Sequence, residues 1–229
     1  IKQTEDDAGR ILGGGVISIT EPWFPRGSDL SFKRMHFRGK DWGALHIIKS
    51  SHLWYSAREH KDENIPLTVN IGVPPAVMLM AAALTIHPIV PHGSDELGIA
   101  GALQGSPVEL CKAKTVDAYA IANSEWVIEG YCTPDMVWES EEAERIGKER
   151  VAPIWPEWFG YVAHGTRVRK FQVTAITHRR DRPIFFNPLV HSFEHENMVK
   201  TIREACFYEL AERLVPGLVQ DVNILHGIK

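Results

Sequence analysis

The sequence predicts an α+β fold, and three observations support this class. Short segments rich in β-branched residues follow one another along the chain. Helices are inserted between some of these segments instead of alternating strictly with them, which favours an α+β or barrel-centred architecture over a doubly wound sheet. No repeat and no Gly/Ser- or Pro-rich linker divides the 229 residues. We therefore expect one domain with a helical C-terminal extension.

Eight segments are predicted as strands because β-branched and aromatic residues pack well on a pleated surface. They are Gly15–Thr20, Ser31–Phe37, Ala44–Ile48, Leu67–Gly72, Val108–Ala113, Ala118–Ala122, Trp126–Tyr131 and Lys170–Thr177.

Four segments are predicted as helices, and most have a recognisable start or end. They are His52–Lys61, Pro75–Leu84, Asp95–Gln104 and Glu194–Leu214. Pro75 suits a first helical turn, where its missing N–H costs nothing. Ser94 or Asp95 can cap the third helix, and Pro216 with Gly217 ends the fourth. The acidic segment from Thr133 to Glu149 is predicted as a solvated excursion in which a short helix could form.

Composition excludes several classes of partner. The net charge is −4 and the pI is about 6.3, so neither nucleic acid nor an anionic membrane surface is expected as the main partner. The apolar run from Val77 to Leu84 is far shorter than the roughly 18 residues of a membrane span and suggests a buried helix. Three cysteines without CxxC spacing favour a reducing, cytoplasmic setting. Because the sequence opens at Ile1, we expect a processed chain, an internal fragment or one subunit of a split enzyme.

Three polar segments could carry chemistry. Ser28–Arg34 places a carboxylate at a strand entrance, followed by a hydroxyl and basic residues. Ser51 and His52 lie at a helix start, where backbone N–H groups can face an anion. Ser94–Glu96 lies in a Gly-flanked turn that leads into a helix of small residues. An Asp, a His and a Glu drawn from these segments would together suit a divalent ion such as Mn²⁺, Mg²⁺ or Fe²⁺. Such triples also arise by chance among eleven histidines and many carboxylates, so surface residues and helix caps remain the alternative.

The turn Gly72–Ala76 follows an apolar strand and leads rigidly into a helix. It lacks the glycine spacing of a Rossmann or P-loop phosphate cradle, and the chain has no GxSxG or HExxH motif. On pattern alone, a purely structural turn is the favoured interpretation.

Four segments in the same order resemble the UbiD decarboxylase family, which uses prenylated FMN. They are Ile65–Ala76, Ser94–Leu110, Ala122–Gly130 and Phe171–Arg179. The resemblance covers about residues 10 to 190. It implies a split β-barrel flavin-binding domain with inserted helices over residues 1–192, and a helical extension, 193–229, that leads toward a further C-terminal domain.

The resemblance also implies a cofactor site. In the family an Asn, a His and a Glu hold a divalent ion at the flavin phosphate, and the matching positions here are Asp29, His52 and Glu96, with Mn²⁺ as the expected metal. A K⁺ site would use carbonyls around Met80–Ala83. The positions that match the family's flavin contacts are Ser31, Phe32, Lys33, Arg34, Ser51, His52, Leu53 and Trp54.

The catalytic residues implied by the resemblance are Arg34, which positions the substrate carboxylate, and Glu157, the proton donor. A first acid of the family falls on Ala152, which leaves the family's Arg–Glu–Glu network incomplete. Glu149 could fill it only through a local shift. Aromatic walls for a flat substrate would come from Trp155, Trp158 and Phe159, for which hydrophobic core is the alternative.

The implied activity is reversible, non-oxidative decarboxylation of an aromatic, heteroaromatic or α,β-unsaturated carboxylic acid. Prenylated FMN would act as the electron sink while CO₂ leaves, and a flavin prenyltransferase would supply it. A homo-oligomer is expected. The alternative is a non-catalytic flavin-binding or assembly subunit of a carboxylase complex, which the missing acid at Ala152 would favour.

Overall fold

The computed structural model describes residues 9–20, 22–24, 27–83, 89–156, 161–185 and 193–224. Its helices are α1 (His52–Glu59), α2 (Pro75–Ala82), α3 (Glu96–Gln104), α4 (Glu141–Ile146) and α5 (Phe193–Leu214). Its strands are β1 (Ile11–Leu12), β2 (Val16–Thr20), β3 (Ser28–Phe32), β4 (Met35–Phe37), β5 (Trp42–Leu45), β6 (Ile65–Ile71), β7 (Leu110–Lys112), β8 (Tyr119–Ile121), β9 (Trp126–Trp138), β10 (Pro153–Pro156), β11 (Val162–His164) and β12 (Arg167–His178).

An eight-stranded sheet in the order β1-β4-β5-β12-β9-β6-β2-β3 forms the body of the protein. All its pairings are antiparallel. The long strands β9 and β12 run together from Trp126 opposite His178 to Trp138 opposite Arg167, with two irregularities in register. These findings confirm the α+β class.

The sheet is strongly curled, as its connectivity requires. β3 forms one edge, and β4 lies second from the other edge, six strand spacings away. Across a flat sheet this separation would be about 29 Å. Only Lys33 and Arg34 separate the two strands in sequence, and three Cα steps reach at most about 11 Å. The two ends of the sheet must therefore approach each other at this junction.

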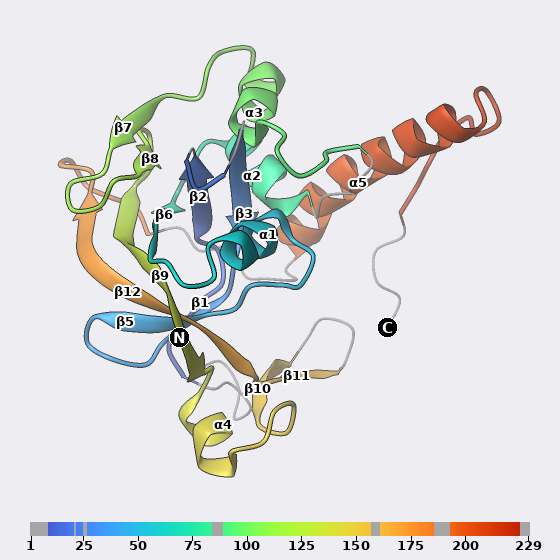
Figure 1. The fold of residues 1–229 in the computed structure, drawn as a ribbon. Coiled ribbons are helices and arrows are strands. Elements are labelled where there is room, and N and C mark those ends of the chain that lie inside the picture. The colour runs from blue at the N-terminus through green and yellow to red at the C-terminus, as the bar shows by residue number, and fades with distance from the viewer. Residues whose placement is uncertain are drawn as a thin grey trace.

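Two apolar clusters stabilise this arrangement. One gathers strand residues such as Ile17, Leu67 and Phe171, together with Leu53 of α1. The other joins β2 and β3 to the helices, with Val77 of α2 at its centre. In Figure 1, α2 and α3 lie beside β2 and β3, and α5 extends away from the body. The helices therefore pack beside the edge strand that carries Asp29.

The four predicted helices are confirmed to within about two residues at the ends the structure describes; Leu84 lies outside the described residues. The prediction of one continuous strand over Ser31–Phe37 is wrong, because this segment belongs to two strands, β3 and β4. β3 pairs with β2 and β4 pairs with β5, so the chain leaves one end of the sheet and joins the other within this segment. Strands β1, β10 and β11 were not predicted.

The acidic segment Thr133–Glu149 is only partly a solvated excursion. Its first residues continue β9 as far as Trp138, and Glu139 and Ser140 are buried. The short acidic helix does form, as α4, and the Ser140 hydroxyl caps it by accepting from the Ala143 N–H. Among the described residues, no helix is long and apolar enough to span a bilayer.

Replacing Phe171 with alanine should destabilise the protein strongly. Phe171 is fully buried in the sheet cluster, and removing such a ring typically costs about 3–5 kcal/mol in unfolding free energy. Ile176 on the same strand is 58% exposed, so Ile176→Ala should change that free energy by less than about 0.5 kcal/mol. Urea unfolding of both variants checks this, and equal losses would contradict the packing described.

Candidate functional site

The edge strand β3 is fastened to the start of α3 by Ser28. Its backbone N–H donates to the carbonyl of Ser94 at 3.3 Å. Its hydroxyl donates to the Asp95 carboxylate at 2.6 Å and accepts from the Leu97 N–H at 2.8 Å. The side chain of Ser28, from strand β3, thus caps the start of α3, a role that the sequence assigned to Ser94 or Asp95. Gly27 permits this approach, because a Cβ there would lie 2.4 Å from the Ser94 carbonyl oxygen.

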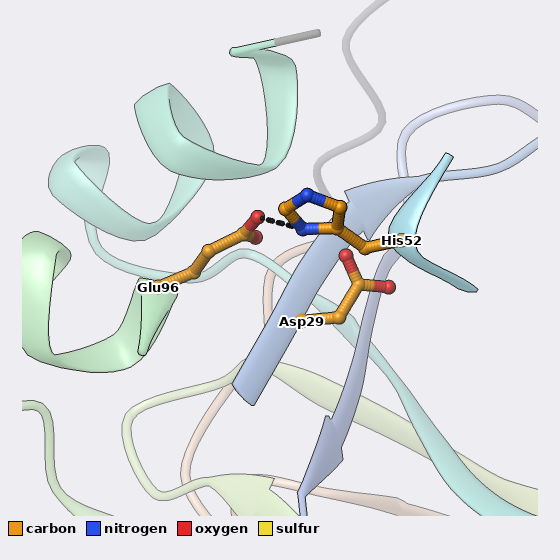
Figure 2. A group of neighbouring side chains, drawn as sticks. All are labelled: Asp29, His52 and Glu96. Atoms are coloured by element: carbon orange, nitrogen blue, oxygen red, sulfur yellow. Dashed lines mark hydrogen bonds and ion pairs between the residues drawn. The ribbon is translucent and has the colours of Figure 1, made fainter. Parts of the chain in front are cut away.

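Asp29, His52 and Glu96 meet beside this contact (Figure 2), although they come from β3, α1 and α3. One Glu96 oxygen accepts from the Leu30 N–H at 2.7 Å, and the other lies 2.9 Å from His52 Nδ1. One potential ligand atom from each of the three residues lies within 4.8 Å of the others. All three side chains are buried, with at most 2% exposure.

The pKa values of all three residues of this cluster are raised. Burial raises the pKa of Asp29 above its ordinary value, against the opposing effects of Lys33 and His52. Burial also raises the pKa of Glu96, to about 7, despite hydrogen bonds from His52 and Leu30. Burial disfavours charged His52, but the hydrogen bond and charge of Glu96 outweigh it and raise its pKa. Two buried carboxylates and an imidazole within reach of one another fit a divalent cation with oxygen and nitrogen ligands.

A cavity of about 190 Å³ adjoins the cluster. Of the expected flavin contacts, Ser31, Phe32, Lys33, Ser51 and His52 line this cavity. Met80 and Ala81, from the segment expected to bind K⁺, line it as well.

The other expected flavin contacts lie elsewhere. Leu53 is fully buried in the sheet cluster. Trp54 lines a separate surface groove and stacks on Arg58, whose guanidinium carbon lies 5.4 Å from its ring centre. Arg34 is turned toward Glu139.

The loop before α1 forms the rim of the cavity. Ser50 has φ of +70°, an uncommon conformation for a residue other than glycine. Ser51 then caps α1, since its hydroxyl accepts from the Trp54 N–H at 3.3 Å. The predicted helix start at Ser51 and His52 is therefore confirmed, and it directs His52 toward Glu96.

Arg34 and Glu139 form a bidentate ion pair on the other side of the junction. Arg34 Nη2 donates to Glu139 Oε2 at 3.0 Å, and Arg34 Nε donates to Oε1. The Glu139 side chain is fully buried, and that of Arg34 is 14% exposed. His36 Nδ1 lies 3.0 Å from the Glu139 carbonyl oxygen, and Trp155 lies over the guanidinium at 5.4 Å. The pair is thus held on several sides.

Glu139 is the site residue that sequence reasoning missed. The first acid was assigned to Ala152, which is buried and accepts a backbone hydrogen bond from Gly165. Glu149, which could have replaced that acid only through a local shift, accepts from the exposed backbone N–H of Arg167 at 3.3 Å. An acid therefore does stand beside Arg34. No local sequence signal marked Glu139, because the predicted strand Trp126–Tyr131 stopped short of it, and only the structure extends β9 to Trp138.

The expected proton donor Glu157 lies outside the described residues, as do Trp158 and Phe159. The aromatic walls are therefore described only at Trp155. That ring is partly buried and packs on Arg34 and near His36.

Comparison with known proteins gives a consistent picture. Gallate decarboxylase from Lactiplantibacillus plantarum is 33% identical over 223 residues, which cover 96% of this chain and 44% of that protein. The UbiD-class enzyme HmfF from Pelotomaculum thermopropionicum, solved with prFMN, matches with a TM-score of 0.82 and 29% identity, over 99% of this chain and 48% of that one. The apo 3,4-dihydroxybenzoic acid decarboxylase from Enterobacter cloacae matches with a TM-score of 0.78 and 27% identity, over 96% and 44%.

The chain thus spans less than half the length of these relatives. A family model described as the 3-octaprenyl-4-hydroxybenzoate carboxy-lyase Rift-related domain matches residues 1–192. This match covers most of the chain, so the chain belongs to the UbiD family.

Proposed function

We propose that this chain is the flavin-binding part of a carboxy-lyase that removes CO₂ from an aromatic or α,β-unsaturated carboxylic acid with the help of prenylated FMN. The observation that carries the proposal is the placement of two buried groups on either side of one chain junction. The Asp29–His52–Glu96 cluster lies on one side, and the Arg34–Glu139 pair lies on the other. Two relatives named for the decarboxylation of aromatic acids support an aromatic substrate.

The proposed metal is Mn²⁺, held by Asp29, His52 and Glu96. Their mixed oxygen and nitrogen atoms suit such an ion, and their burial makes a bound cation favourable. The adjoining cavity would hold the phosphate end of the flavin through Ser31, Lys33 and Ser51, with K⁺ near Met80–Ala83 as a second proposed ion. When bound, the prenylated flavin supplies the electron sink for loss of CO₂.

Arg34 has the role of orienting the substrate carboxylate, because its planar guanidinium can bind two oxygens at once. Glu139 holds one edge of the guanidinium and balances its charge in a buried site. Trp155 covers its face and offers a flat apolar wall to an aromatic ring. Glu157 has the role of protonating the carbon that loses CO₂. The reaction is proposed to be reversible, as the family resemblance implies.

The alternative of a non-catalytic assembly subunit depended on a missing acid at Ala152. Glu139 is paired with Arg34, and this nearby acid supports the catalytic interpretation instead. We therefore keep decarboxylation as the single proposed activity.

The proposal extends to the architecture and setting of the protein. Residues 1–192 would form a split β-barrel, a closure that the short Lys33–Arg34 connection between opposite ends of the sheet supports. Residues 193–229 would lead into a further domain, in a homo-oligomer supplied by a flavin prenyltransferase. The three cysteines are free thiols, which supports a reducing, cytoplasmic compartment.

Replacing Glu157 with glutamine should abolish turnover without releasing the cofactor. The amide cannot donate the proton that the carboxylic acid donates. Protein co-expressed with a flavin prenyltransferase should show prenylated FMN by absorbance and intact mass in both wild type and variant. Assays should cover a panel of aromatic, heteroaromatic and acyl-CoA carboxylates. A fully active variant would exclude Glu157 as donor, and failure of the wild type to bind the flavin would argue against the proposed function.

Glu139→Gln should lower kcat by about 100-fold, a typical effect of displacing a positioned group. Glutamine keeps the size of the side chain but loses the charge that fixes Arg34. Glu149→Gln is the matched control, because Glu149 was the other candidate acid and its carboxylate contacts exposed backbone. A larger loss of turnover in Glu149→Gln than in Glu139→Gln would reverse the assignment. Thermal unfolding of both variants separates lost chemistry from lost folding.

Stabilisation by Mn²⁺ should increase with pH. Burial raises the Glu96 pKa from 4.5 to about 7, so between these values the folded protein holds a proton that the unfolded chain has released. For this group, stability without metal is therefore greatest at low pH and falls as the pH rises through that window. Mn²⁺ requires the deprotonated carboxylate. The rise in Tm on adding Mn²⁺ should be larger at pH 8 than at pH 6 and should vanish in Glu96→Gln. An equal rise at both pH values would contradict this coupling.

A further inference from the structure

Lys33 is a buried cation close to the proposed metal ligands. Its side chain is 6% exposed, and it lines the same cavity as Asp29 and Ser31. These three residues alternate along the chain, so in an extended segment they face the same side. Lysine is almost never buried to this extent unless it has a partner for its charge. The position therefore calls for an anionic group near its ammonium.

The surrounding protein meets this need only in part. Burial lowers the pKa of Lys33 below its ordinary value, and the negative charges of Asp29 and Glu96 oppose this shift. Within the part of the chain that the structure describes, neither carboxylate forms a direct ion pair with its ammonium. Each of them has another partner, since Glu96 binds His52 and the Leu30 N–H, and Asp29 accepts from Ser31. The N–H groups of Lys33 thus remain available to a ligand in the cavity.

The charges of the site show what such a ligand would be. Asp29 and Glu96 contribute two negative charges, which a divalent ion bound with neutral His52 would cancel. Lys33 then leaves the loaded site with one net positive charge in a buried environment, where charge is weakly screened. Without Lys33 the loaded site would be neutral. A phosphate dianion is attracted more strongly by the first arrangement than by the second.

We infer that Lys33 offsets the carboxylate of Asp29 and thereby makes the metal-loaded site selective for a flavin that carries a phosphate. This inference rests on the proposed function, because it assigns a specificity role within the same cofactor site. Lys33 would contact the phosphate and not the reacting carbon, so it determines which flavin binds rather than the chemistry.

The test compares FMN, which carries the phosphate, with riboflavin, which lacks it. Binding of both to the full chain loaded with Mn²⁺ is followed by flavin fluorescence. Lys33→Met should weaken FMN binding about 10- to 100-fold, the usual range for a lost hydrogen bond to a charged group. Riboflavin binding should stay within about threefold of wild type. Lys33→Gln repeats the test with a polar side chain, in case methionine perturbs folding.

Mn²⁺ binding without flavin gives a second, opposite signature. Removing a nearby cation reduces repulsion of the metal, so Lys33→Met should bind Mn²⁺ more tightly than wild type while it binds FMN more weakly. A merely structural role for Lys33 would weaken both. Calorimetric titration with Mn²⁺ alone distinguishes these outcomes.

Two further variants complete the design. Asp29→Asn with Lys33→Met restores one net positive charge to the loaded site, so FMN affinity should recover toward wild type. Lys49→Met is the matched control, because Lys49 lines the same cavity but is exposed, where solvent screens its charge. An equal loss of FMN affinity in Lys49→Met, or no recovery in the double variant, would overturn the inference.

The remaining outcomes separate this inference from the proposed function. If wild type and Lys33→Met bind FMN equally well, only the role of Lys33 is overturned. Wild type that binds neither flavin overturns the cofactor site itself.

Discussion

The carboxylate of Glu96 joins the parts of the site that are far apart in sequence. One oxygen accepts from the backbone of β3, and the other binds His52 at the start of α1. Because β3 is an edge strand, its outer N–H groups would otherwise face solvent or another chain. The start of α3 occupies this edge through Glu96 and through the cap from Ser28. The same contacts that protect the edge therefore place Asp29, His52 and Glu96 together.

The curled sheet explains why the second half of the site lies so near. Lys33 lines the cavity next to the buried cluster, and its neighbour Arg34 pairs with Glu139 at the end of β9. A flat sheet would separate these regions by several strands. Closure at the junction places two adjacent residues in two different regions, one proposed to bind a metal and phosphate and the other proposed to bind a carboxylate.

Sequence reasoning gave the helices because their signals are local: a proline in the first turn of α2, and Ser51 before α1. Sequence reasoning could not predict that Ser31–Phe37 is divided between two strands, because the division arises only from pairing with different partner strands. Glu139 was missed because an acid-rich segment ordinarily faces solvent, and its burial depends on Arg34, 105 residues away. The Ser28 cap depends likewise on a partner 69 residues away. The grouping of Asp29, His52 and Glu96 came from family resemblance, since their spacing alone is ordinary.

The junction of Lys33 and Arg34 also fixes the spacing between the two proposed binding regions. Neighbouring side chains on an extended chain point to opposite sides, so one peptide unit sets both the distance and the direction between the two binding regions. Inserting or deleting a single residue here would reverse the alternation of side chains along the extended chain, so that each following side chain would point to the opposite side. If the proposed substrates diversify, we therefore expect the walls around Trp155 to change while the length of this short connection stays constant.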